Sequence, residues 1–183
     1  MFQRRADPAR LWFVDESGSH VAMSRTHARA PRGERASDKV PRNRGTIITM
    51  IGALSLAGLG PLMTVEGGTS GEVFLAYMEQ VLLPVVSRGD IIVLDNLGAH
   101  KDARVRAAAQ HAGVRLVYQP AYSPELNPIE LAWAKLKWFL KVAKARTKES
   151  LDTAIAFAAD IIGLDGDAPG WFRHCGWQWE PLP

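Results

Sequence analysis

Two short apolar runs, LWFV at 11–14 and IIVL at 91–94, are each followed directly by an aspartate. Runs of this length and composition are typical of buried strands. Asp15 and Asp95 would then stand at strand ends, where α/β sheets often bind ligands. For either aspartate alone, ending its strand or capping the next element is the preferred explanation. Two of them at neighbouring strand ends would repel each other unless a cation lay between them, and Mg²⁺ favours such oxygen ligands.

The remaining pattern predicts an α/β fold, a mixed sheet flanked by helices. Three early strands form a meander and alternating helices and strands follow. We expect the further strands at 45–58, 61–65 and 114–118, and the helices at 71–86, 102–112, 128–143 and 149–163. An Arg-rich segment at 16–44, a loop at 119–128 and an aromatic tail at 166–183 are expected to be irregular.

The bulk composition fits one globular domain outside the membrane. A chain of 183 residues, 47% hydrophobic and 22% charged, can bury a full core. No apolar run approaches the roughly 18 residues that cross a bilayer, and LWFV is too short for a signal peptide. The single cysteine, Cys175, has no internal disulfide partner, which fits a reducing cytosol. We therefore expect a cytoplasmic protein with no membrane partner.

Positive charge gathers in two segments of the chain. Residues 1–44 hold ten Arg or Lys against five acids, and residues 131–148 hold six with no acid. Basic clusters of this kind point to a polyanionic partner such as nucleic acid. A solvated surface with uneven charge would give the same pattern.

A third acid stands at the start of the helix expected from residue 128. Asn127 suits the N-cap and Glu130 the third helical position, so capping its own helix is one sufficient explanation for Glu130. Lys137, Lys141 and Lys144 fall within about 40° of Glu130 around the helix axis. One helix face thus carries a carboxylate and then a row of lysines, as a metal-dependent DNA-cutting site would need.

Three longer blocks, FVDESG, VLDNLGAH and PAYSPELNPIELAWAKLK, resemble the signature blocks of mariner-related bacterial insertion-sequence transposases. These enzymes belong to the DDE superfamily and have a ribonuclease H-like catalytic domain. The 34 residues between Asp95 and Glu130 match that superfamily's spacing. RAPRGERA, PRNRGTIITMIGAL and WFRHCGW extend the resemblance from about residue 11 to 177. It implies that Asp15, Asp95 and Glu130 form the acidic triad of a catalytic domain at 11–165, between a remnant at 1–10 and the tail at 166–183.

The resemblance also implies a reaction and its partners. The triad would hold two Mg²⁺ or Mn²⁺ ions about 4 Å apart, one activating water or a DNA 3′-hydroxyl and the other stabilising the leaving oxygen. The enzyme would hydrolyse DNA at transposon ends and join the freed 3′-end to target DNA at TA dinucleotides. We expect a homodimer, because two ends must meet, and an association with the bacterial nucleoid.

Residues close to the three acids have competing interpretations. We expect Asn96 and His100 to lie next to the metal-ligating residues and to hold them in place. His100 could also orient a phosphate or a metal-bound water. A surface histidine at a loop-to-helix junction is the alternative for His100. Lys101 and Arg104 either contact phosphate or are simply solvated.

Four other side chains have structural interpretations that we prefer. Glu16 should point away from Asp15 along the strand, so it is not expected to be a ligand. Tyr122 is expected to pack over the sheet edge rather than to stack on a base. Trp133 and Trp138 are expected to be core or half-buried residues, not stacking platforms.

Family members usually carry N-terminal helix-turn-helix units that read the terminal repeats of the element. The 14 residues before Asp15 are too few for one such unit. Three explanations are open: the chain is a downstream reading frame whose upstream half carries these units, a truncated copy, or a partial gene model.

Two other functions remain open at this point. The first is another ribonuclease H-like nuclease, such as a resolvase or an RNA-strand hydrolase, against which the 34-residue spacing and the NPIE block count. The second is a catalytically silent remnant that only binds DNA or a full-length partner.

Overall fold

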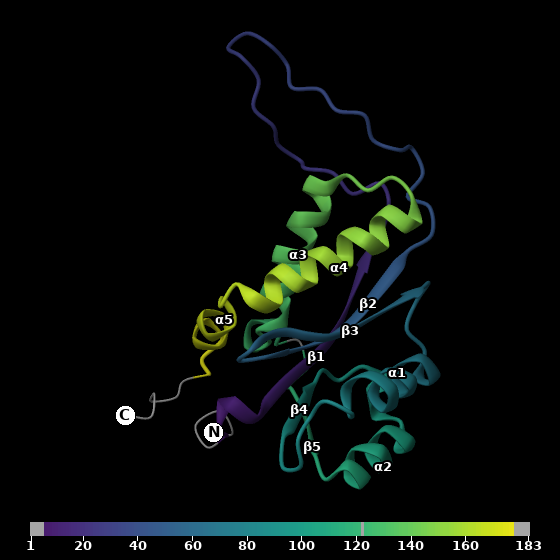
Figure 1. Ribbon diagram of the computed structural model, residues 1–183, viewed down its shortest axis with the longest axis vertical. Coiled ribbons are helices and arrows are strands. Elements are labelled where there is room, and N and C mark those ends of the chain that lie inside the picture. Colours follow the sequence, from purple (N-terminus) through teal and green to yellow (C-terminus); the bar gives the residue numbers. More distant parts are fainter. Residues whose placement is uncertain (1–5, 122, 178–183) are drawn as a thin grey trace.

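The computed structural model describes residues 6–121 and 123–177, and a five-stranded mixed sheet runs through its centre (Figure 1). The strands lie in the order β3-β2-β1-β4-β5. They are β1 (Leu11–Ser19), β2 (Ile48–Ser55), β3 (Gly58–Glu66), β4 (Ile91–Leu94) and β5 (Arg115–Tyr118). The first three strands are antiparallel neighbours, whereas β4 runs parallel to both β1 and β5. The expected mixed sheet and its order along the chain are confirmed.

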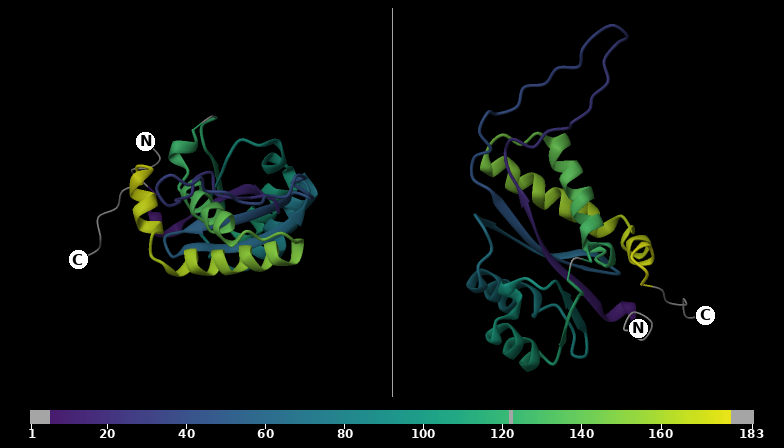
Figure 2. Two further views of the ribbon diagram at one scale, coloured as in Figure 1. Left: turned by 90° about the horizontal axis from the view of Figure 1, so that it is seen from above. Right: turned by 180° about the vertical axis from the view of Figure 1, so that it is seen from behind.

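Helices cover both faces of this sheet (Figures 1 and 2). They are α1 (Gly71–Tyr77), which continues as a π-helical turn at Met78–Leu82, α2 (Ala103–Ala112), α3 (Ile129–Ala143), α4 (Lys148–Leu164) and α5 (Ala168–His174). One core joins α3, α4 and α5 to the face of β1 that carries Leu11 and Phe13. A second core joins α1 and α2 to the opposite face, which carries Val14. Alternation along β1 therefore puts Asp15 on the α3 side and Glu16 on the α1 side.

Strand β1 is longer than expected, and Asp15 is not at its end. The N-terminal half pairs with β4 over Leu11–Phe13, and the later part pairs with β2 from Phe13 to Ser19. The polar residues after Asp15 lack the apolar signature used to predict strands, but pairing with β2 satisfies their backbone groups all the same. The irregular segment therefore begins only after Ser19. In Figure 1 it leaves the sheet as a long arm between β1 and β2.

The C-terminal segment also differs from the expected irregular tail. Residues Ala168–His174 form α5, and Phe172 and Trp177 are buried. Both rings contact Phe13 edge to face, with centroids 5.2 and 5.0 Å away. The aromatic residues of this segment therefore belong to the same core as β1. The aromatic composition was noticed in the sequence, but this docking was not predicted.

Helix α3 packs on the sheet through the buried side chain of Trp133. A Cβ atom added to Gly52 of β2 would lie 2.9 Å from Cη2 of Trp133. The ring therefore occupies the space that any larger residue at 52 would need. Gly52 is also the residue paired with Asp15 in the β1–β2 register. This contact fixes α3 beside the middle of β1.

The part of the chain that the structure describes has no helix long and apolar enough to cross a membrane.

Replacing Gly52 with valine should destabilise the fold, because the added side chain collides with Trp133 despite the preference of valine for strands. We expect the free energy of unfolding to fall by about 3 kcal/mol, measured by urea denaturation. Gly18→Val is the matched control, since this glycine is exposed on β1 and an added Cβ meets only ordinary contact. Equal stability of the two variants would contradict the packing of α3 described above.

Candidate active site

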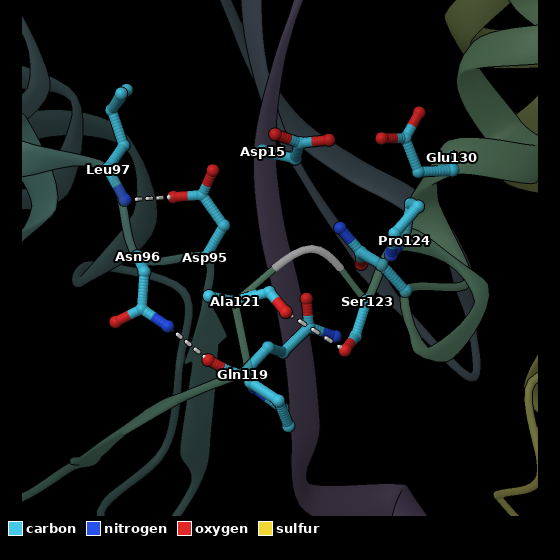
Figure 3. Close-up of a pocket in the computed structure, with 11 residues that line it drawn as sticks. Asp15, Asp95, Asn96, Leu97, Gln119, Ala121, Ser123, Pro124 and Glu130 are labelled. Atoms are coloured by element: carbon cyan, nitrogen blue, oxygen red, sulfur yellow. Dashed lines mark hydrogen bonds between the residues drawn. The ribbon is translucent and has the colours of Figure 1, made fainter.

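Asp15, Asp95 and Glu130 line one cleft of about 530 Å³. Asp15 comes from the middle of β1, Asp95 directly follows β4, and Glu130 lies in the first turn of α3. Figure 3 shows the three carboxyl groups around the same opening, with Asp15 between the other two. Three acids that are far apart in the sequence are thus gathered at one place on the sheet.

Strand register explains why the two aspartates meet. Phe13 pairs with Val93 in the parallel β1–β4 ladder, and each aspartate lies two residues beyond its member of that pair. Glu130 reaches the same cleft because Trp133, one turn further along α3, is fixed against Gly52 opposite Asp15. The position of each acid therefore follows from backbone pairing and core packing.

The surroundings of Asp15 disfavour the negatively charged form of its carboxyl group. Burial raises the pKa of its carboxyl group to about 7, a backbone hydrogen bond from Glu16 opposes the shift, and the charges of Glu130, Glu16 and Asp95 add to it. The carboxyl group is therefore partly protonated at neutral pH unless a positive charge enters the cleft. A divalent cation would supply that charge.

Asp95 is held by two contacts that both use its Oδ1 atom. The backbone N–H of Leu97 donates to this oxygen at 2.8 Å. Nδ1 of His100 lies 2.6 Å from it, in a direction outside hydrogen-bond geometry, so we treat this approach as a charge contact. The described residues provide no partner for Oδ2, which stays available to a ligand.

His100 connects Asp95 to Glu16 across the sheet. Its ring is fully buried, stacks at 4.1 Å from the ring of Phe74, and places Nε2 3.0 Å from Oε1 of Glu16. Burial disfavours the charged ring, but the hydrogen bond and charge of Glu16, with the charge of Asp95, outweigh it and raise the pKa of His100. A protonated ring would donate to Glu16 through Nε2 and place its positive charge beside Oδ1 of Asp95. The alternative of a surface histidine is wrong.

Glu16 is the residue of this cluster whose part the sequence did not predict. It points away from Asp15, as expected, and lies outside the lining of the cleft. Instead its carboxylate contacts the far side of His100, 84 residues away in the sequence. The alternation of β1 gave the direction of the side chain, but only tertiary structure brings the histidine to it.

Asn96 and Gln119 close the floor of the cleft. The side-chain amide of Asn96 donates to the backbone oxygen of Gln119, and the side chain of Gln119 donates to the backbone oxygen of Leu126 at 3.2 Å. The indole N–H of Trp177 donates to the same oxygen of Leu126 at 3.0 Å. The C-terminal segment thus helps to fix the loop that leads into α3 and Glu130.

The alternative interpretation, in which Asn127 and Glu130 cap α3, is wrong. Pro128 is the N-cap residue, and no side chain caps the helix. The oxygen of the Asn127 side chain is buried without a hydrogen-bond partner and lines the cleft. Glu130 is exposed, and within the described residues no hydrogen bond or ion pair engages its carboxylate. Capping therefore does not account for Glu130.

The oxygen atoms that line the cleft are ligands of the kind that hard divalent cations bind. The side chains that carry them do not yet surround a single point in space. No three His, Cys, Asp or Glu residues within 6–121 and 123–177 are gathered closely enough to hold an ion. Three carboxylates line the cleft, the free Oδ2 of Asp95 and the unengaged Glu130 are available, and the unpartnered amide oxygen of Asn127 adds a neutral donor. Such oxygen ligands are the kind that Mg²⁺ and Mn²⁺ favour.

The basic residues expected near the cleft divide into paired and unpaired ones. Arg104 is tied to Glu72 and Asp102, with contacts of 2.8 and 2.6 Å, so it is not free to bind phosphate. Lys144 is paired with Asp38 at 2.7 Å. No ion pair or hydrogen bond of the described chain involves the remaining three, which are Lys101, Lys137 and Lys141.

The aromatic residues near the acids have mixed outcomes. Trp133 is buried, as expected. Trp138 is 54% exposed, so its ring is about half-buried and lies outside the core. At 100° per residue Trp138 lies about 160° from both Leu136 and Leu140, so the periodicity of α3 places it opposite the apolar stripe. Tyr122 lies outside the described residues.

Comparison with known proteins finds a matching family model and two similar transposases. The family model described as "DDE superfamily endonuclease" matches residues 10–152. The Tc1 transposable-element transposase of Caenorhabditis elegans is 30% identical over 143 residues, covering 73% of this chain and 52% of that protein. The Tcb1 transposase of Caenorhabditis briggsae is 28% identical over 108 residues, covering 57% of this chain and 40% of that protein.

A solved structure shares the fold at low sequence identity. The Mos1 transposase paired-end complex with left transposon end has a TM-score of 0.68 and 17% identity, covering 96% of this chain and 54% of that one. The expected ribonuclease H-like fold is confirmed by this likeness. The chain spans about half the length of the relatives it matches. The match over residues 10–152 covers most of the sequence, and the chain therefore belongs to the DDE superfamily endonuclease family.

Proposed function

We propose that this chain is the catalytic domain of a DNA transposase, a metal-dependent endonuclease that cuts DNA at transposon ends and transfers the 3′-hydroxyl end to target DNA. The observation that carries the proposal is the gathering of Asp15, Asp95 and Glu130 in one cleft. The raised pKa of Asp15 supports it, because this site favours an added positive charge. Membership of the DDE superfamily endonuclease family supports the same reaction class.

Asp15, Asp95 and Glu130 would hold two Mg²⁺ or Mn²⁺ ions. When bound, such ions supply an activated nucleophile and stabilise the leaving oxygen of a phosphodiester. Asp95 would use its free Oδ2, because Leu97 and His100 already hold Oδ1. Glu16 and His100 would keep Asp95 turned toward the cleft, and Asn96 would hold the loop in place through Gln119. No serine or tyrosine nucleophile is required, since water or a DNA 3′-hydroxyl attacks.

The partners follow from this reaction. The substrate would be DNA, at transposon ends and at target TA dinucleotides, with Lys101, Lys137 and Lys141 available to bind phosphate. A homodimer would bring two ends together, and a separate helix-turn-helix half would recognise them. Residues 11–165 would carry the catalytic activity, working at the nucleoid of a bacterial cytoplasm.

The first test is the nicking of supercoiled plasmid with Mg²⁺ or Mn²⁺, followed on agarose gels. Asp95→Asn and Glu130→Gln should each lower the rate by at least about a hundredfold, because each removes a metal ligand. Glu125→Gln is the matched control, since this exposed acid lies just before α3 but outside the cleft lining. Equal rates in wild type and Asp95→Asn would reject a metal-dependent nuclease at this cleft.

Asp15→Asn should stabilise the metal-free protein at high pH. The pKa of Asp15 is about 7 when folded, against 3.8 for its ordinary value, so the folded protein keeps a proton that the unfolded chain releases between those values. Wild-type stability is therefore lost as pH rises from about 4 to about 7, and asparagine removes this loss. We expect Asp15→Asn to gain up to about 4 kcal/mol over wild type at pH 8 in EDTA, and almost nothing at pH 4.

Urea unfolding at the two pH values measures this difference. Asp160→Asn serves as the control, because it removes an exposed carboxylate from α4 and should show no such dependence. A gain for Asp15→Asn that is the same at both pH values would contradict the electrostatic account of the cleft.

Glu16→Gln should weaken metal binding although Glu16 lies outside the cleft. The amide keeps the shape of the side chain but removes the charge that orients His100, and disturbing such supporting partners typically costs about tenfold or more in metal affinity. Calorimetric titration with Mn²⁺ measures the affinity, and ¹⁵N chemical shifts of the His100 ring report its protonation. Unchanged values in both measurements would show that Glu16 is only structural.

A further inference from the structure

An exposed tryptophan stands between two unpaired lysines on α3. The side chain of Trp138 is 54% exposed, and its ring is held edge to face against Phe139, with centroids 5.2 Å apart. Lys137 and Lys141 lie on either side of it along the helix. In the described part of the chain neither lysine makes an ion pair or a hydrogen bond.

The absence of partners distinguishes these two lysines from the other cations of the same region. Lys135 is paired with Asp165 and Asp167, and Lys148 is paired with Glu66. At the end of α3, Lys144 is paired with Asp38, and Arg146 donates to the backbone oxygens of Val21 and Met23. Intramolecular contacts thus occupy the surrounding cations, and the two that remain available are those beside Trp138.

Lys137 and Lys141 lie on the same side of α3 as Glu130, and Trp138 lies about a quarter turn away around the helix axis. Trp138 is eight residues after Glu130, which places it about 12 Å further along the helix axis. Lys137 and Lys141 point within about 20° of the direction of Glu130, and Trp138 within about 80°. The surface therefore leads from the cleft toward the far end of α3, where the arm between β1 and β2 is attached through Lys144 and Arg146 (Figure 1).

We infer that Trp138 is a stacking platform for an unpaired DNA base, with Lys137 and Lys141 binding the phosphates on either side of that base. Every base has a face that stacks on an aromatic ring, and a single strand can place successive phosphates beside two cations. A paired duplex keeps its bases stacked on one another and has no free face to offer. This inference rests on the proposed function, because it names the form of DNA that reaches the cleft.

The charges favour DNA over an apolar protein partner at this surface. An apolar partner that covered Trp138 would also bury two cations without counter-charges, which is unfavourable. A DNA strand supplies a phosphate for each lysine and a base for the ring, so it satisfies all three side chains at once.

The test is the binding of the full chain, in EDTA, to labelled oligothymidine and to a labelled hairpin duplex, followed by fluorescence anisotropy. Trp138→Ala should bind oligothymidine about tenfold more weakly, bind the duplex almost unchanged, and leave the salt dependence of binding unaltered. Trp138→Phe should restore most of the affinity, because it keeps an aromatic face. Lys137→Ala or Lys141→Ala should instead lower the slope of log affinity against log salt by about 0.7 each.

Phe157→Ala is the matched control, because this aromatic side chain is 65% exposed on α4, and its loss should leave both affinities unchanged. Oligothymidine affinity in Trp138→Ala equal to wild type would overturn the platform, and so would equal losses on oligothymidine and duplex.

Plasmid nicking separates the two proposals. Nicking by wild type together with unchanged oligothymidine binding in Trp138→Ala rejects the platform alone. Lost oligothymidine binding in that variant, without nicking by wild type, rejects the proposed nuclease alone.

Discussion

The contact between Trp133 and Gly52 determines where the third acid of this site can be. The indole ring fills the space above Gly52, and Gly52 pairs with Asp15 in the adjacent strand. Because Glu130 lies one turn before Trp133 on the same helix, the packing of the Trp133 ring on Gly52 also brings the carboxylate of Glu130 to the cleft. A local packing arrangement between a small and a large residue thus connects α3 to the strand that carries Asp15.

The cleft brings carboxylates close together, which is electrostatically unfavourable as long as no cation is bound between them. Burial and neighbouring acids raise the pKa of Asp15, while His100 stands between Glu16 and Asp95 on the opposite side of β1. The raised pKa of His100 favours a positive charge behind Asp95, and the contacts of the histidine leave the cleft side of that residue free. Such an arrangement suits a site that completes its charge balance only when cations are bound.

Several parts of this structure could be predicted from the sequence because they depend on local pattern. Apolar runs located β1 and β4, helical periodicity located α3 and α4, and the motif resemblance pointed to Asp15, Asp95 and Glu130, which line one cleft. The extension of β1 to Ser19 could not be predicted, since its residues are polar and their pairing with β2 is a long-range contact. The docking of Phe172 and Trp177 on Phe13 is another long-range contact. The link from Glu16 to His100 spans 84 residues, which no local spacing reports.

The central claim is that Asp15, Asp95 and Glu130 share divalent ions, and anomalous diffraction from crystals of this chain grown with Mn²⁺ tests it most directly. We predict manganese peaks inside the cleft, coordinated by oxygens from all three side chains, with Asp95 contributing Oδ2. A cleft without such a peak at saturating Mn²⁺, or ions bound without one of these three acids, would contradict the account.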